Sequence, residues 1–307
     1  MQISTSQLYD RSTAMMQSLS ARADKLQTQI STGIRLTAPS DDVVAYQKLA
    51  TLKRAGANDQ AYTANINVAT SVLAQSDTTL ASIENQLQRA AELATQANNG
   101  TLSPENRKVI GEQLKGIVQD LVGLANTKDV RGQPLFGAAT GDTAVTQGAD
   151  GSVHFTGTGE SAPIPVGDGV TVQANDSAAR LFGGIASGSG TSDMFAIIST
   201  LAEALTSDTD ATAAATAAAT QAGTDLKAVL TQVASARGSV GARGARLDLE
   251  LDRLSDTAIT RESDRVGLED TDATAAITEL KKMMTVLEAT QASFSKLSSL
   301  SLFNYLS

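Results

Sequence analysis

Apolar residues return every seven positions between residues 66 and 97, in two interleaved rows. One row is Ile66, Leu73, Leu80, Leu87 and Ala94, and the other is Ala69, Ser76, Ile83, Ala90 and Ala97, which is apolar except at the serine. Alternating steps of three and four keep both rows on one side of an α-helix that is about 45 Å long. A helix cannot bury such a stripe against itself, so the pattern predicts a long helix packed against other helices.

A second helix is expected shortly after the first. The segment 98–100, Asn-Asn-Gly, is typical of a helix end, because glycine readily adopts the left-handed conformation that closes a helix. Ser103, Pro104 and Glu105 are typical of a helix start, where they supply an N-cap, a proline at the first position and an early acid. The second stripe is Ile110, Leu114, Ile117, Leu121 and Leu124. A short turn between two such helices predicts an antiparallel hairpin.

Thinner apolar stripes lie near both ends of the chain. The N-terminal stripe is Leu8, Met15, Leu19, Leu26 and Ile30. A long helix is expected over residues 209–266, and the final stripe after it is Ala273, Ala276, Leu280, Met283, Leu287, Thr290, Phe294 and Leu297. The spacing of these stripes predicts terminal helices that each have one narrow apolar side.

These terminal helices carry too few apolar residues to fold alone. Ordering about 35 residues costs on the order of 35–70 kcal/mol of backbone entropy, whereas five apolar side chains return roughly 1.5–3 kcal/mol each. We therefore expect the ends to be disordered in the monomer and to become ordered on an external surface. The predicted assembly interface is Leu8, Met15, Leu19, Leu26, Ile30, Leu280, Met283, Leu287, Phe294, Leu297, Phe303 and Tyr305.

The middle of the chain has a different composition. Thirteen of the 24 glycines and three of the five prolines fall within residues 132–190, and residues 132–226 hold ten acids and one base. Residues 143–147 and 152–156 flank a Gly-Ala-Asp-Gly turn and predict a β-hairpin, and 162–166 and 169–173 are further candidate strands. An acidic, turn-rich segment of this kind is expected to stay solvated and outside the helical packing.

The predicted fold is therefore mainly α with a small β insertion, in which the N-terminal and C-terminal arms form a long antiparallel helical bundle or coiled coil around a central β-rich lobe. The expected divisions are terminal assembly arms at 1–42 and 268–307, a helical rod domain at 43–138 and 192–267, and an inserted outer domain at 139–191.

Residues that carry out chemistry are scarce. The chain has no cysteine and one histidine, His154, so neither a disulfide nor a thiolate metal site can form. Residues 270–272 begin like a calcium loop, but Ala275 and Lys281 stand where glycine and glutamate are needed. The glycine-rich segment 184–190 lacks the lysine of a phosphate-binding loop. We expect no catalytic, cofactor-binding or metal-binding residue, which disfavours a coiled-coil enzyme or ligand-binding protein.

Charge and hydropathy also restrict the partners. The net charge of −9 argues against nucleic acid. No run approaches 18 consecutive apolar residues, so no membrane partner is expected, and the N-terminus lacks the pattern of a cleaved secretory signal. Six arginines between Arg237 and Arg265 alternate with acids, which predicts either an ion-paired helix surface or lateral contacts between subunits.

Several segments together resemble the flagellin superfamily of bacterial flagella. They are residues 1–5, 31–42, 98–107, 124–132, 240–243, 268–272 and 292–306. The ending Ser301-Leu-Phe-Asn-Tyr-Leu306 is similar to that of the hook-associated junction proteins within the superfamily, whereas flagellins more typically end in Asn-Val-Leu-Ser-Leu-Leu.

This resemblance implies an extracellular structural subunit of the flagellum, secreted by type III flagellar export without a cleaved signal peptide. It implies a ring of copies at the junction between hook-associated protein 1 and the flagellin filament, and a cytoplasmic export chaperone on the C-terminal region. The alternative is a short flagellin that forms the filament itself.

Overall fold

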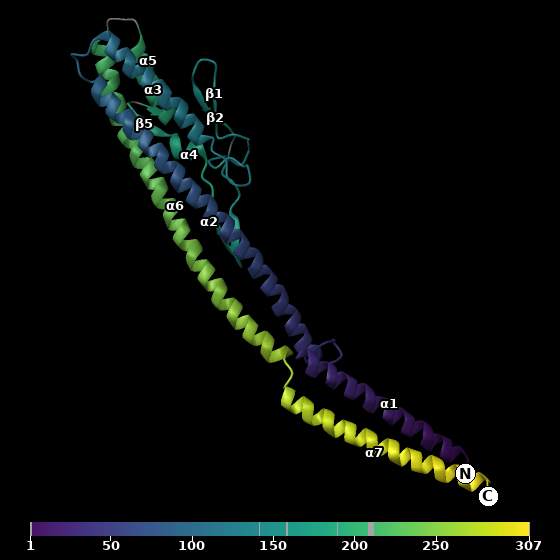
Figure 1. Cartoon of the computed structure of the whole chain (residues 1–307). Coiled ribbons are helices and arrows are strands. Elements are labelled where there is room, and N and C mark those ends of the chain that lie inside the picture. The colour runs from purple at the N-terminus through teal and green to yellow at the C-terminus, as the bar shows by residue number, and fades with distance from the viewer. Residues whose placement is uncertain (1, 141, 158, 189, 208–211, 307) are drawn as a thin grey trace. The chain divides into compact units, whose positions relative to one another are not determined.

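The computed structural model describes residues 2–306 except 141, 158, 189 and 208–211, and among these it describes no side chains at 2–6, 8, 212 and 297–306. The helices are α1 (Gln2–Thr32), α2 (Val43–Ala97), α3 (Pro104–Ala125), α4 (Ala178–Phe182), α5 (Met194–Thr206), α6 (Thr212–Glu269) and α7 (Ala273–Leu306) (Figure 1). The strands are β1 (Val145–Gln147), β2 (Val153–Phe155), β3 (Ile164–Gly167), β4 (Val170–Val172), β5 (Ile185–Ser187) and β6 (Gly190–Ser192). The predicted fold class, mainly α with a small β insertion, is confirmed.

The chain divides into two compact units, and both long helices, α2 and α6, run through the two. The first unit contains residues up to 58 and from 256 onwards, and the second contains residues 59–255. The bounds expected from sequence differ from these, since they separated the terminal arms at 42 and 268 and gave the β insertion a domain of its own. Within the structure the insertion belongs to the second unit.

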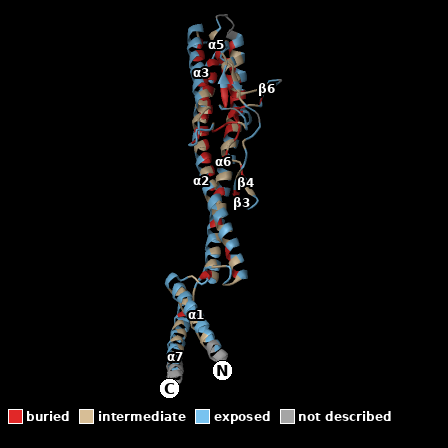
Figure 2. Cartoon of the chain, turned by 90° about the vertical axis from the view of Figure 1, so that its right-hand side faces the viewer, coloured by how far each residue is buried: buried red, intermediate tan, exposed pale blue. Residues whose placement is uncertain are grey.

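The core of the second unit is built on the heptad rows of α2. All ten positions of the two rows are buried, and Ile83, Leu87 and Ala90 are completely so (Figure 2). The side chain of Gln86 donates to Asp120 of α3 at 3.3 Å, and that of Gln75 donates to the carbonyl of Lys128 at 2.8 Å. The later residue of α2, Gln86, contacts Asp120 within α3, and the earlier one, Gln75, contacts Lys128 beyond the end of α3. The two helices therefore run in opposite directions and form the expected antiparallel hairpin.

Helix α5 packs against α3, and two local features make this possible. The Asp193 carboxylate caps α5 by accepting hydrogen bonds from the amides of Phe195 and Ala196, both at 2.9 Å. Gly111 of α3 has no side chain where α5 passes, and a Cβ there would lie 2.6 Å from Thr206 Cγ2 and 3.0 Å from the Ala202 carbonyl oxygen. Glycine at this position therefore allows the two helices to approach closely.

The insertion consists of three antiparallel two-stranded sheets and the short helix α4. The expected hairpin is confirmed as β1–β2, with Val145 opposite Phe155. The second pair of candidate strands forms β3–β4, which has a register shift between Pro165 and Gly167. The hairpin β5–β6 and helix α4 were not predicted by the sequence pattern.

The insertion shares its hydrophobic core with the bundle. Val145, Val166 and Phe182 belong to the same cluster of buried residues as the rows of α2. The Phe182 ring lies 5.6 Å from that of Phe136 and 6.4 Å from that of Phe195 in α5, measured between centroids. The sequence argument placed this acidic, glycine-rich segment outside the helical packing, but its apolar side chains pack inward. Of its acids, Asp142, Asp150, Glu160 and Asp168 are exposed, and Asp176 is buried.

Candidate functional site

The terminal helices α1 and α7 lie side by side in the first unit (Figure 1). Tyr9 and Phe294 meet edge to face, with ring centroids 5.3 Å apart and an interplanar angle of 87°. At the opposite ends of the two helices, Ile34 and Asp270 form an isolated antiparallel bridge. The start of α1 therefore lies beside the later part of α7, and the pair is antiparallel.

Each helix directs one row of apolar residues at the other. On α1 the partly buried apolar residues are Tyr9, Met16, Leu19, Ala23, Leu26 and Ile30, and on α7 they are Leu280, Met283, Leu287 and Phe294. The spacing of three and four is that of a two-helix seam. Of the described side chains of α1 and α7, Ala276 alone is buried. Two helices cover only one side of each other, so this contact leaves much apolar surface in water.

The uncovered apolar residues lie mainly on α7. Met284 is 50% exposed, Ile277 40% and Val286 38%. Val286 also lines a groove of about 670 Å³ together with Leu19 of α1, Met283 and the polar side chains of the first turns of α7. A groove that combines exposed apolar side chains with polar ones is typical of a surface that binds another protein.

The predicted interface residues fall into three groups. Leu19, Leu26, Ile30, Leu280, Met283, Leu287 and Phe294 lie half-buried in the α1–α7 pair. Met15 is 55% exposed and lies outside the seam. The side chains of Leu8, Leu297, Phe303 and Tyr305 lie outside the described residues.

Sequence reasoning missed Tyr9 and Met16, which both lie in the seam, and it chose Met15, which does not. The seam positions 9, 16, 19, 23, 26 and 30 follow the three-and-four spacing more closely than the positions chosen from the sequence. Because Met15 and Met16 are adjacent and both apolar, α1 alone does not distinguish them. The position of α7 makes the choice.

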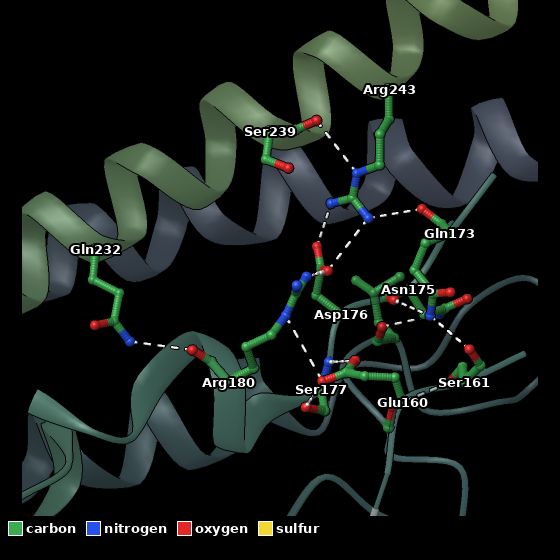
Figure 3. A network of polar contacts seen from close by, with 12 residues as sticks. Glu160, Ser161, Gln173, Asn175, Asp176, Ser177, Arg180, Gln232, Ser239 and Arg243 are labelled. Carbon is green, nitrogen blue, oxygen red and sulfur yellow. Dashed lines mark hydrogen bonds and ion pairs between the residues drawn. The ribbon is translucent and has the colours of Figure 1, made fainter. Parts of the chain in front are cut away.

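A second cluster of polar side chains ties the insertion to α6 (Figure 3). Arg243 of α6 donates to the carbonyl of Gln173 at 2.7 Å and pairs with the buried carboxylate of Asp176, which also pairs with Arg180. Gln232, three turns earlier on α6, donates to the carbonyls of Leu181 and Gly183 at 3.0 Å. Helix α6 thus holds both ends of α4, and the cluster is structural.

The charged face of α6 also joins α2. Arg237 donates to Asp77 at 2.9 Å and to Glu84 at 2.7 Å, and these hydrogen bonds raise the pKa of the Arg237 guanidinium above its usual value. Burial lowers the pKa of Arg243, but an arginine stays protonated at neutral pH. Arg253 and Arg265 pair with Glu250 and Glu262 on the same helix, as the first of the two sequence interpretations expects. Arg237 and Arg243 instead pair with acids of other elements.

The histidine, His154, is exposed on strand β2 and lies beside Ser152 and Asp150 of the turn before it. Ser152 Oγ donates to Asp150 Oδ1 at 2.7 Å and lies 2.9 Å from His154 Nε2. The single hydroxyl proton goes to the carboxylate, so the imidazole donates to the serine and does not activate it as a base. Across the described part of the chain there is no cluster of three or more His, Cys, Asp or Glu residues able to hold a metal ion.

Residues 270–272, which begin like a calcium loop, form the break between α6 and α7. Asp272 caps α7 by accepting a hydrogen bond from the Ala275 amide at 3.0 Å.

No helix in the described residues is both long enough and apolar enough to cross a bilayer.

Comparison with known proteins identifies the family. Residues 3–140 match the bacterial flagellin N-terminal helical region, and residues 224–306 match the bacterial flagellin C-terminal helical region. Flagellar hook-associated protein 3 of Salmonella typhimurium is 28% identical over 316 residues, and that of Escherichia coli is 29% identical over 318, each covering 99% of both chains.

A solved structure has the same fold. The crystal structure of flagellar hook associated protein-3 from Legionella pneumophila superposes with a TM-score of 0.67 at 16% identity, covering 71% of this chain and 98% of that one. The flagellin matches include both terminal helices and the bundle helices α2, α3 and most of α6. The chain therefore belongs to the flagellin superfamily of bacterial flagellar structural proteins, which are not enzymes, and along nearly its whole length it is similar to hook-associated protein 3.

Proposed function

We propose that this protein is the subunit of a ring that joins hook-associated protein 1 to the flagellin filament. The observation that carries the proposal is the half-covered α1–α7 pair, whose apolar side chains stay exposed on a chain similar throughout to hook-associated protein 3. A junction subunit must present such surfaces to copies of itself and to the proteins on either side.

The assembly surface consists of the α1–α7 seam and the groove beside it. In the ring, neighbouring subunits cover Met284, Val286 and the rest of the groove, which adds the apolar burial that the two helices lack alone. The helices of the two terminal segments, α1 and α7, become ordered in this process and are disordered in the isolated monomer.

The same disorder suits the proposed route to the cell exterior. The chain passes unfolded through the flagellar type III export apparatus, without a cleaved signal peptide, and a cytoplasmic chaperone holds its C-terminal region before export. The absence of cysteine prevents disulfide crosslinks that would obstruct an unfolded chain in transit.

The position of the protein in sheared flagella tests the function. Immunogold labelling of a tagged chain is expected to mark one narrow band between hook and filament, with a copy number far below that of flagellin. Labelling along the whole filament would instead support the second candidate, a short flagellin, which the family match also allows.

A matched pair of surface variants tests the assembly surface. Val286→Asp places a charge in the groove, whereas Val109→Asp places one on α3, where the valine is 55% exposed. The free energy of unfolding of both variants should lie within about 0.5 kcal/mol of that of the unmodified protein, because both side chains are exposed to water. Only Val286→Asp should fail to restore motility in a strain lacking the protein. Normal incorporation of Val286→Asp would remove the groove from the interface.

A further inference from the structure

Two helix breaks of the first unit, the one after α1 and the one between α6 and α7, lie next to each other. Helix α1 ends at Thr32 and α6 ends at Glu269. The Arg35 amide donates to the carbonyl of Glu269 at 2.7 Å, and the Thr271 amide donates to the carbonyl of Gly33 at 2.9 Å. Gly33 has φ = 72°, in the left-handed region that favours glycine, which lets the chain leave α1 toward this contact. The two breaks are thus hydrogen-bonded to each other.

One carboxylate joins the break to α2. Glu269 is 5% exposed and accepts hydrogen bonds from Lys53 of α2 at 3.1 Å and from Arg265 at 2.6 Å. Burial raises the pKa of Glu269, but the hydrogen bonds from Arg265 and Lys53 outweigh this and hold its pKa below the usual value. The Arg35 side chain adds a hydrogen bond to the carbonyl of Leu268 at 2.9 Å.

The connection between α1 and α2 is ordered by a second carboxylate. Asp41 accepts hydrogen bonds from the amides of Thr37 and Ala38, both at 3.0 Å, and pairs with Lys25 of α1. Asp42 then caps α2 by accepting from the Ala45 amide at 2.9 Å. Helix α2 therefore starts with its own cap and does not depend on hydrogen bonds from α1.

We infer that the hydrogen bonds between residues 33–35 and 268–271, together with the contacts of Glu269 with Lys53 and Arg265, form a latch. This latch stops the unfolding of α1 and α7 from spreading into α2 and α6. The stretches beside the latch need such support. Between residues 43 and 58 only Ala45 and Leu49 are buried, so little apolar packing holds the start of α2. The inference rests on the proposed disorder of helices α1 and α7 before assembly, because only then does unfolding have to be stopped at the ends of these helices.

Amide hydrogen exchange on the full-length chain tests the latch. The Arg35 and Thr271 amides are direct reporters because they form the hydrogen bonds between the breaks. In the unmodified monomer, these amides and residues 43–58 should be protected, while α1 and α7 exchange rapidly. Glu269→Gln should accelerate exchange at the reporters and at 43–58 by at least about tenfold, which corresponds to about 1.4 kcal/mol.

Glu262→Gln is the matched control. It removes a carboxylate that pairs with the same Arg265, but on the exposed side of α6. Exchange at the reporters should change by less than about twofold in this variant. Equal exchange in Glu269→Gln and Glu262→Gln would overturn the latch.

A second variant decides the case in which Glu269→Gln destabilises the whole chain and also accelerates exchange near Leu80. Lys53→Met leaves Glu269 paired with Arg265, and it should accelerate exchange at 43–58 alone. Unchanged exchange there would overturn the latch. If α1 and α7 are protected in the unmodified monomer, the proposed disorder fails. The latch is still judged from the reporters in the two glutamate variants.

Discussion

Arg243 of α6 and Asp176, two residues before α4, form a buried ion pair that fastens the β insertion to the helical bundle. The Asp176 side chain is 5% exposed and that of Arg243 is 16% exposed. Arg180 contacts the same carboxylate from the other side (Figure 3). Replacing one residue of a buried ion pair destabilises the protein, because the charge of the other residue stays buried without a partner.

Arg243→Met is therefore expected to destabilise the second unit by about 1–3 kcal/mol, somewhat less than a fully isolated buried charge costs, since Arg180 still contacts Asp176. Urea unfolding measures this loss. In a double-mutant cycle with Asp176→Asn, the two losses should be less than additive. Full additivity would show that the two side chains do not interact.

Two glycines of α3 should respond to alanine in opposite directions. A Cβ at Gly111 meets Thr206 and the Ala202 carbonyl, whereas a Cβ at Gly116 has no heavy atom within 4 Å. Gly116→Ala should stabilise the protein by up to about 1 kcal/mol, which is the difference in helix propensity. Gly111→Ala should destabilise it, because α5 must move away. Thermal unfolding of both variants, followed by circular dichroism, compares the two effects. A gain in stability for both would mean that α3 and α5 have room between them.

Aspartate substitutions in the two helical seams should separate folding from assembly. Leu80→Asp puts a charge at a site that is 1% exposed, and it should cost at least about 4 kcal/mol and abolish the cooperative melting of the bundle. Leu287→Asp lies in the half-covered terminal pair and should leave that melting transition nearly unchanged while preventing assembly. An equal loss of stability in both variants would mean that the terminal pair belongs to the folded core of the monomer.

Stability should fall in acid, partly through Asp129. Burial raises the pKa of Asp129, but hydrogen bonds from the Arg131 side chain and the amides of Gln133 and Arg131 outweigh this effect and hold the pKa below its usual value. A pKa lower in the folded state than in the unfolded state stabilises the protein above the unfolded pKa, and this contribution is lost as pH falls through the folded pKa. Asp129→Asn should therefore flatten the decline of melting temperature below about pH 4. An unchanged slope would assign the acid sensitivity to other carboxylates.

The sequence alone determined the parts of this protein that depend on local periodicity. The rows from Ile66 to Ala97 repeat with the period of a helix, so their burial could be predicted without knowing the partner. The cap at Ser103 was also predictable, and its side chain accepts a hydrogen bond from the Asn106 amide at 3.3 Å. The apolar stripes of α1 and α7 predicted terminal helices with one apolar side, to within one residue at Met15.

Tertiary structure decided what depends on contacts between distant residues. Helix α4 has five residues, too few to show a period, and it is held by Gln232 and Arg243, which lie about 50 to 70 positions later. Phe182 enters the core because Phe136 and Phe195 surround it, which the acidic, glycine-rich composition of the insertion does not reveal. The burial of Met16 instead of Met15 and the pairing of Glu269 with Lys53 also depend on residues that are distant in the sequence. Each side chain is selected by a neighbour that only the folded chain brings within reach.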